Sequence, residues 1–212
     1  MHWRDAPATV VITLATLVVS LLILLSGWLP EAAIGGGVIP ARLSGAVLPP
    51  DRGAVVPAWL TPLTATLVHG GSAHVALNLV MLAYCGARTE RALGPAGVGV
   101  LYVVGAYAAA AGQWSVSPTS PMPMIGASGA ISAIVAAYSL LYGERRARSV
   151  GPVSAGVMHV LWLAAAWIGI QALIGVAGLG GGPTIAIGAH IGGFLAGLAL
   201  ARPLLLWRYR GA

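Results

Sequence analysis

Residues 92–143 read ALGPAGVGVLYVVGAYAAAAGQWSVSPTSPMPMIGASGAISAIVAAYSLLYG, a run of 52 residues that contains no charged side chain. A helix needs roughly 20 apolar residues to cross a bilayer, so this run is too long for one crossing. It is interrupted at residues 115–123, where prolines cluster and end the helical pattern. The stretch therefore predicts two membrane-spanning helices, over residues 94–112 and 128–142.

The rest of the chain has the same character. Hydrophobic residues make up 58% of its 212 residues and charged residues only 8%, whereas a soluble domain carries roughly 25% charged residues. The fold class expected is therefore an all-α membrane protein with six transmembrane helices. Residues 30–71 hold charges and several prolines, and we expect them to form a long loop lying partly in the membrane interface. The expected helices are residues 6–29, 73–90, 94–112, 128–142, 153–177 and 186–206.

The positive charge indicates how the chain is oriented in a membrane. All 11 basic residues are arginines and the net charge is +6, but they lie between hydrophobic runs, so we expect no binding to nucleic acid. Short loops alternate between arginine-rich and arginine-free, which places both termini in the cytoplasm and loops one, three and five outside. In chain order the arginines are Arg4, Arg42, Arg52, Arg88, Arg91, Arg145, Arg146, Arg148, Arg202, Arg208 and Arg210.

Few polar side chains fall inside the predicted helices. His74 and Asn78 lie early in the second helix, Ser128 begins the fourth and His190 lies early in the sixth. These three helices all run from outside to inside, so the four side chains are expected at one depth, just below the outer surface. A polar group in a bilayer is costly and is a functional candidate by default.

Ser128 and His190 form a candidate catalytic pair. A serine hydroxyl becomes a useful nucleophile when a neutral imidazole removes its proton. A carboxylate partner is not expected, so the pair is a Ser–His dyad. The acids are Asp5, Glu31, Asp51, Glu90 and Glu144, all in expected aqueous segments.

A tetrahedral intermediate also needs hydrogen-bond donors for its oxyanion. The backbone N–H of Ser128 is one candidate, at the N-terminus of a helix whose dipole favours negative charge. His74 and Asn78 are spaced i, i+4 and share one helix face, so both side chains can point at the same oxygen.

Small residues explain how the dyad can assemble. Gly126 and Gly129 flank Ser128, and Gly193 and Gly197 form a small face one and two turns after His190. Such faces let helices approach closely in lipid. The single cysteine, Cys85, forms neither an internal disulfide nor a metal cluster, and we expect no metal. His159 is expected near the cytoplasmic face, remote from the other polar residues, in a structural role.

The sequence resembles the rhomboid family over residues 59–200. The resemblance lies in His-xxx-Asn (His74, Asn78), Gly-x-Ser-Gly (residues 126–129) and Ala-His-x-x-Gly-xxx-Gly (residues 189–197). The run 86–94, GARTERALG, also resembles the family's turn after the second helix. His69 matches an earlier histidine of the family, which is taken to support the loop.

The resemblance implies a single rhomboid-like transmembrane domain over residues 1–212. It implies a serine endopeptidase that cleaves transmembrane segments of other proteins through an acyl-enzyme, without metal or cofactor. Its partners are then transmembrane protein substrates and the lipid bilayer. Residues 153–177 and 178–185 would serve as lateral gate and cap. The expected location is a bacterial plasma membrane, with the active site opening to the outer face.

Two departures from the family bear on the site. Many members have Trp-Arg in loop one, whereas Trp59 is followed here by Leu60. Some bacterial members place a tyrosine one turn after the serine, stacked on the histidine, and Ser132 stands there in this chain. His190 must then be oriented by something else.

Other functions fit the residues less well. An inactive rhomboid-like protein that binds membrane clients is the main alternative, although such proteins lose the serine or the histidine. A transporter would show repeats or polar residues along a pore. A diaspartyl protease needs two membrane-embedded aspartates, and a zinc protease needs His-Glu-x-x-His. Neither pattern is present.

Overall fold

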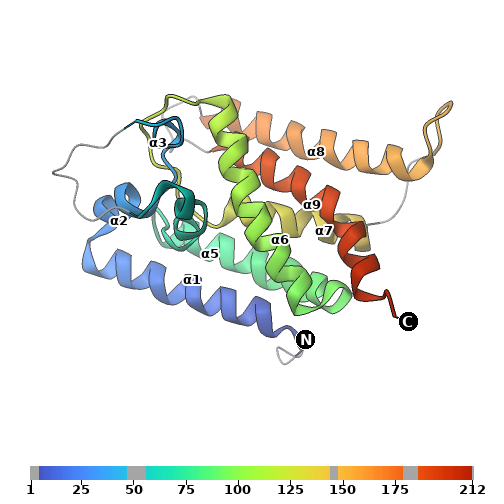
Figure 1. Ribbon diagram of the computed structural model, residues 1–212, viewed down its shortest axis with the longest axis horizontal. Helices are drawn as coiled ribbons and strands as arrows, with labels where there is room; N and C mark the ends of the chain where they lie inside the picture. The colour runs from blue at the N-terminus through green and yellow to red at the C-terminus, as the bar shows by residue number, and fades with distance from the viewer. Residues whose placement is uncertain (1–4, 47–55, 144–147, 179–185, 212) are drawn as a thin grey trace.

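The computed structural model describes residues 5–46, 56–143, 148–178 and 186–211. Helices are the only regular elements within these ranges. In Figure 1, α6, α7 and α9 form the centre of the bundle, with α1 and α5 on one side and α8 on the other. The longer helices are α1 (Pro7–Ser26), α5 (Ser72–Met81), α6 (Ala87–Val116), α7 (Ser128–Tyr142), α8 (Ala155–Gly178) and α9 (Ile187–Arg208).

The segment expected as a long loop contains short helical turns. Pro30, Pro40 and Pro62 each stand at the first or second position of one of these turns, where a missing N–H costs nothing. The prolines that prevent a membrane crossing therefore also initiate short helices. These are α2 (Leu29–Gly36), α3 (Pro40–Leu43), η3 (Ala58–Leu60), α4 (Thr61–Thr64) and η4 (Ala65–Leu67).

The boundary between the second and third expected helices is a kink in a continuous helical segment. A π-helical turn, η5 (Leu82–Gly86), joins α5 to α6. The backbone then leaves the helix at Gly94, with φ 76° and ψ 169°, immediately before Pro95. A side chain at Gly94 would collide with the Arg208 guanidinium at the end of α9, so glycine satisfies both the conformation and the space.

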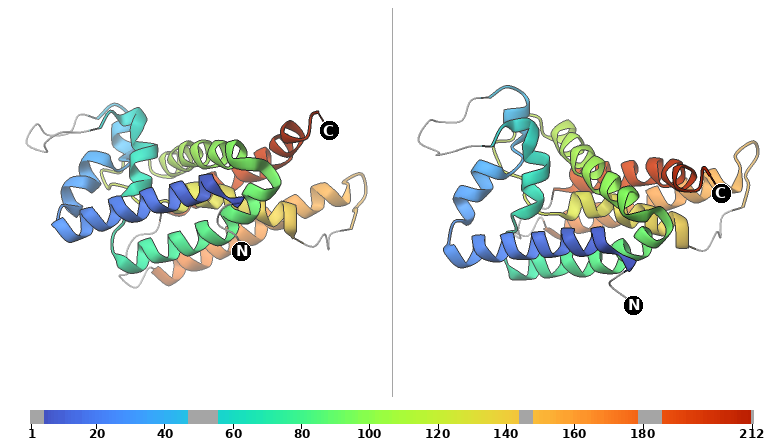
Figure 2. Two further views of the ribbon diagram at one scale, coloured as in Figure 1. Left: turned by 90° about the horizontal axis from the view of Figure 1, so that it is seen from below. Right: turned by 60° about the horizontal axis from the view of Figure 1, so that its bottom comes forward.

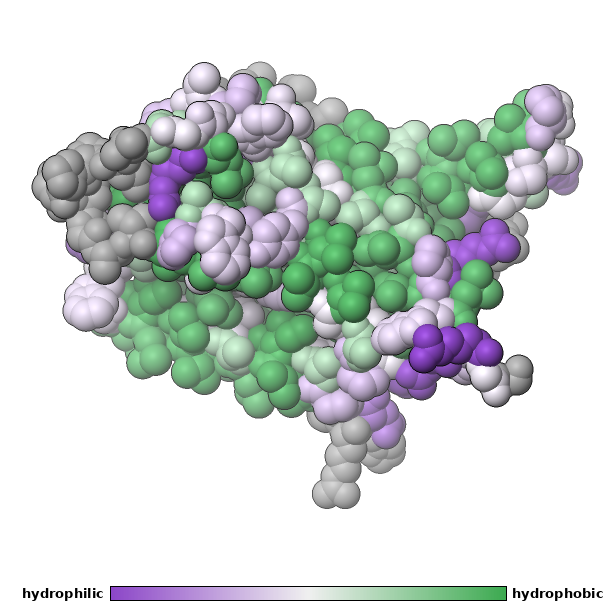
Figure 3. All heavy atoms as spheres, viewed as in Figure 1, coloured by the Kyte–Doolittle hydropathy of each residue, from purple (hydrophilic) through white to green (hydrophobic). Residues whose placement is uncertain are grey.

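Several helices have the length and composition of membrane spans. Among the described residues these are Pro7–Ser26, Ser72–Val116 and Ile187–Arg208, with shorter apolar helices at Ser128–Tyr142 and Ala155–Gly169. Figure 3 shows hydrophobic side chains over the outer faces of α1 and α8, and hydrophilic ones gathered where α9 ends. The chain is an integral membrane protein by this pattern.

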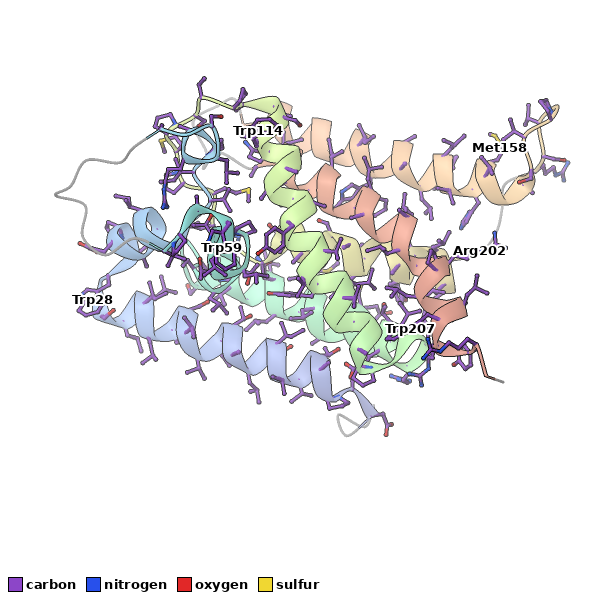
Figure 4. The ribbon with its side chains drawn as sticks, viewed as in Figure 1. Trp28, Trp59, Trp114, Met158, Arg202 and Trp207 are labelled. Atoms are coloured by element: carbon purple, nitrogen blue, oxygen red, sulfur yellow. The ribbon has the colours of Figure 1, made fainter. Side chains whose placement is uncertain are left out.

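Tryptophans lie toward both ends of the bundle. Trp28, Trp59 and Trp114 lie toward the end that carries the short helices, and Trp207 lies toward the other end, near Arg202 (Figure 4). Tryptophan favours the two interfaces of a bilayer, and arginine favours one of them. The start of α1 and the end of α9, which carries Arg208, lie at this second end of the bundle (Figure 1). We call it the arginine end.

Helices α7 and α9 pack through backbone atoms. A Cβ at Gly193 would meet the carbonyl oxygen of Gly129, and a Cβ at Gly197 would meet that of Ala133. The small faces expected on these helices are therefore opposed in the structure, and only glycine fits at the two α9 positions.

Helix α1 begins without a capping side chain of its own, and Glu90 supplies one. The Ala8 and Thr9 N–H groups donate to Glu90 at 2.9 and 2.8 Å, and the Thr9 hydroxyl donates at 2.6 Å. The sequence predicts Glu90 in an aqueous segment, which is wrong, because its side chain is 2% exposed. The carboxylate is buried because it accepts the unpaired donors of a helix N-terminus.

We predict that Glu90→Ala destabilises the protein by about 1–3 kcal/mol, because it leaves buried N–H groups without an acceptor. Thermal unfolding in detergent measures the effect as a lower Tm. Glu90→Gln keeps one acceptor oxygen, so its Tm should lie between those of wild type and Glu90→Ala. Glu31→Ala, at an exposed position in α2, is the control, and an equal Tm for the two alanine variants would contradict the capping role.

Candidate active site

The structure brings Ser128 and His190 into hydrogen-bond contact. Ser128 is the first residue of α7, and His190 lies in the first turn of α9. His190 Nε2 and Ser128 Oγ are 2.7 Å apart. Gly129, the residue after Ser128, and Gly193, one turn after His190, are in backbone contact, and this close approach brings the two side chains within reach.

Both side chains line a cavity of about 650 Å³ that also contains His74 and Asn78. Its walls are contributed by α4, η4, α5, α6, α7 and α9 and by the segments that precede α5 and α7. In the part of the chain that the structure describes, no acidic side chain lines this cavity. The structure thus brings a serine hydroxyl and an imidazole together at this cavity.

The His74 ring is oriented by a backbone contact. The N–H of Gly70 donates to His74 Nδ1 at 3.3 Å, so the proton of a neutral ring is on Nε2. Nε2 points toward Gly126, where a Cβ would lie 2.8 Å from it. Gly126 has φ +111°, so both its conformation and the space beside His74 require glycine.

Asn78 lines the same cavity but is partly engaged by its own helix. Its Nδ2 donates to the carbonyl oxygen of His74 at 2.9 Å. The amide nitrogen carries a second N–H, and the buried Oδ1 has no partner among the described atoms. His74 and Asn78 therefore both present N–H donors close to Ser128.

His69 lies behind this group and is completely buried. The N–H of Ala127 donates to His69 Nε2 at 3.3 Å, and His69 Nδ1 is 2.9 Å from Ser20 Oγ. Its ring edge meets His74 at a centroid distance of 4.9 Å. Burial lowers the pKa of His69 to about 4, so the ring is neutral at pH 7 and can accept the Ala127 bond.

The segment before α7 is also attached through its backbone. Met124 and Val38 exchange two hydrogen bonds, of 3.0 and 2.7 Å, and the N–H of Gly126 donates to the carbonyl oxygen of Ala65 at 2.9 Å. Loop one thus holds the wall of the cavity that leads into Ser128.

The backbone of His190 is contacted from α8, whereas Ser132, one turn after Ser128, bonds within its own helix. Ser132 donates to the carbonyl oxygen of Ser128 within its own helix, at 2.8 Å. Trp167 of α8 donates its indole N–H to the carbonyl oxygen of His190 at 3.2 Å and stacks on Phe194 at 4.8 Å. This contact fixes the backbone of α9 at His190 from the side of α8.

Other candidate residues lie outside the group. His159 is buried near the start of α8 and adjoins Gly143 at the end of α7, and its Nε2 has no partner among the described atoms. The described residues contain no group of three potential metal ligands. Apart from Gly178, the expected cap over residues 178–185 falls outside the described residues.

Sequence reasoning overlooks Ser20 and Trp167. Ser20 could have been found, because Thr9, Thr13, Thr16 and Ser20 are spaced 4, 3 and 4 residues apart and form one polar stripe on an otherwise apolar helix. Trp167 carries no such signal, since tryptophans in membrane helices are common and its partner is a backbone oxygen.

Comparison with known families adds one match. The family model described as the Rhomboid domain matches residues 57–207, which is more than half of the chain and includes α5 to α9 but not α1. No curated protein matches the chain.

We predict that Gly193→Ala lowers the Tm in detergent, because the added methyl group must displace the Gly129 carbonyl, an overpacking that costs roughly 1–3 kcal/mol. Gly99→Ala, in α6, is the matched control, since a Cβ there meets nothing within 4 Å and alanine favours the helix. Equal Tm values for the two variants would mean that α7 and α9 are not in backbone contact.

Proposed function

Because this chain belongs to the rhomboid family, we propose that it is an intramembrane serine endopeptidase that cleaves transmembrane segments of other membrane proteins. The observation that carries the proposal is the 2.7 Å contact between Ser128 Oγ and His190 Nε2, inside a cavity that also presents His74 and Asn78. A nucleophile, a base and convergent donors are the parts that acyl transfer requires.

The chemistry follows from these atoms. His190 Nε2 takes the proton of Ser128 as Oγ attacks the carbonyl carbon of the scissile bond, and returns that proton to the leaving amine. The Ser128 acyl ester is then hydrolysed by water, which His190 deprotonates before the serine hydroxyl is restored. The Ser128 backbone N–H, His74 Nε2–H and the Asn78 amide stabilise the oxyanion in both steps.

Six membrane crossings fit the helices described above, with α5, η5 and the start of α6 counted as one crossing up to the kink at Gly94. The arginine end of the bundle is assigned to the cytoplasm by the positive-inside rule. Ser128 and His190 then lie near the outer face, and the cleaved product leaves on that side.

Helix α8 is the proposed lateral gate. Among the longer described helices, α8 packs on α9 and α7. It lies at the edge of the bundle opposite α1 (Figures 1 and 2). A helix at the edge can move outward to admit a transmembrane segment with less loss of packing than a central one. Trp167 is its link to the base.

We predict that a fluorophosphonate labels the detergent-purified protein and that Ser128→Ala and His190→Ala abolish labelling, because the hydroxyl is activated only by the imidazole. Ser115→Ala, at an exposed serine, is the control and should label like wild type. Asn78→Ala should slow labelling by about 10²-fold if its amide stabilises the oxyanion-like adduct.

Failure of the wild-type protein to label, beside an active rhomboid that does, would contradict the protease proposal. The same conclusion would follow if Ser128→Ala still labelled at the wild-type rate. An inactive rhomboid-like protein that binds membrane clients would then be the better explanation, because it is also consistent with the family match.

We predict that Trp167→Phe slows fluorophosphonate labelling by about 2- to 10-fold, which is the net worth of one hydrogen bond. The phenyl ring preserves the stacking on Phe194 and removes only the N–H that reaches His190. Trp162→Phe is the matched control, because Trp162 lies on the same helix and is 67% exposed. Equal labelling rates in the two variants would show that α8 does not orient the base.

A further inference from the structure

Helix α1 lies outside the family match, yet one of its side chains reaches the segment that carries the proposed nucleophile. Ser20 is completely buried, and its hydroxyl lies 2.9 Å from both His69 Nδ1 and the carbonyl oxygen of Leu67. His69 in turn accepts the N–H of Ala127, the residue before Ser128.

The hydrogen-bond roles in this group follow from the Ala127 amide. The Ala127 N–H can only donate, so His69 Nε2 must accept and the proton of the neutral ring is on Nδ1. Nδ1–H donates to Ser20 Oγ, and the Ser20 hydroxyl donates to the Leu67 carbonyl oxygen, which can only accept. Each donor in the series then has an acceptor. With the ring proton on Nε2 instead, Nε2–H and the Ala127 N–H would be two donors that face each other.

His69 also contacts the other side of the proposed oxyanion site. Its ring edge packs against His74, whose Nε2–H is a proposed oxyanion donor. The amide that follows Ala127 is that of Ser128, the backbone donor. A displacement of His69 therefore moves both donors relative to each other.

We infer that Ser20 is a positioning residue, which accepts from His69 Nδ1–H, fixes the orientation of the His69 ring and so holds the Ser128 amide and the His74 ring in register for catalysis. This inference rests on the proposed function, since it assigns a role in the same reaction. It connects a helix that the family match does not include to the site. Ser20 touches none of the reacting atoms and acts only through His69.

Two measurements on the full-length protein in detergent test this role. The first is the rate of fluorophosphonate labelling of Ser20→Ala, Ser20→Thr and the control Ser26→Ala, an exposed serine of the same helix. We expect Ser20→Ala to label about tenfold more slowly because a buried donor loses its acceptor. Ser20→Thr, which retains the hydroxyl, should restore most of the rate, and Ser26→Ala should match wild type.

The second measurement is the ¹⁵N spectrum of protein labelled at histidine, with the His69 signals assigned from His69→Gln. We expect a protonated Nδ1 in wild type, Ser20→Thr and Ser20→Ala, because the Ala127 N–H still requires Nε2 as its acceptor. The Nδ1 chemical shift should change in Ser20→Ala, where Nδ1–H loses the Ser20 oxygen, and should return toward the wild-type value in Ser20→Thr. A role of Ser20 in packing alone would leave the Nδ1 shift unchanged. Ser20→Cys, which keeps the volume but is a weak acceptor, gives the same comparison if the alanine variant does not fold.

The outcomes separate this inference from the proposed function. Labelling of Ser20→Ala at the wild-type rate, or an unchanged His69 Nδ1 chemical shift, would overturn the positioning role. Absence of labelling in wild type would contradict the protease proposal instead, while the comparison of Nδ1 shifts still decides whether Ser20 holds the His69 ring.

Discussion

Helices α7 and α9 meet through their backbones, with Gly193 and Gly197 of α9 seated on the carbonyl oxygens of Gly129 and Ala133. Lipid offers little hydrophobic drive for helix association, so this contact depends on dispersion between closely fitting surfaces. Because the helices are this close beside Ser128 and one turn after His190, the two side chains come within 2.7 Å of each other. The cavity beside them follows from the same geometry, since its walls are the elements that surround this crossing.

Two sets of buried polar groups join segments that are distant in the chain. Glu90 accepts three donors from the first turn of α1, and His69 joins Ser20 to Ala127. An unpaired polar group costs most where water is excluded, so each such set fixes the relative position of two or more segments. The first set attaches α1 to the start of α6, and the second attaches α1 to the segment that leads into α7. Helix α1 is thus held by its polar stripe, while its opposite face is apolar.

Much of the site was predictable because its residues are polar in an apolar chain. Ser128, His190, His74 and Asn78 could be selected by that contrast, and the helix order placed them at one depth. What could not be predicted was the direction of individual contacts. Asn78 donates back to His74, Glu90 is buried as a cap, and Trp167 of α8 reaches the carbonyl oxygen of His190. These depend on which helices are neighbours, and hydropathy does not report that.

The sequence by itself determined that this chain resides in a membrane, where most of its helices run and which serine and histidine are paired candidates. It did so because charged residues are costly inside a bilayer, so membrane-spanning segments can be recognised as long runs without them. The tertiary structure decided how the pair is oriented and supported. Ser132 leaves the position beside His190 without an aromatic ring, and an indole from α8 and a serine from α1 make contacts around the site. The polar stripe on α1 marks Ser20, but no local pattern encodes the partner of either side chain. Such contacts join residues 23 and 49 positions apart, and only the packing of whole helices brings them together.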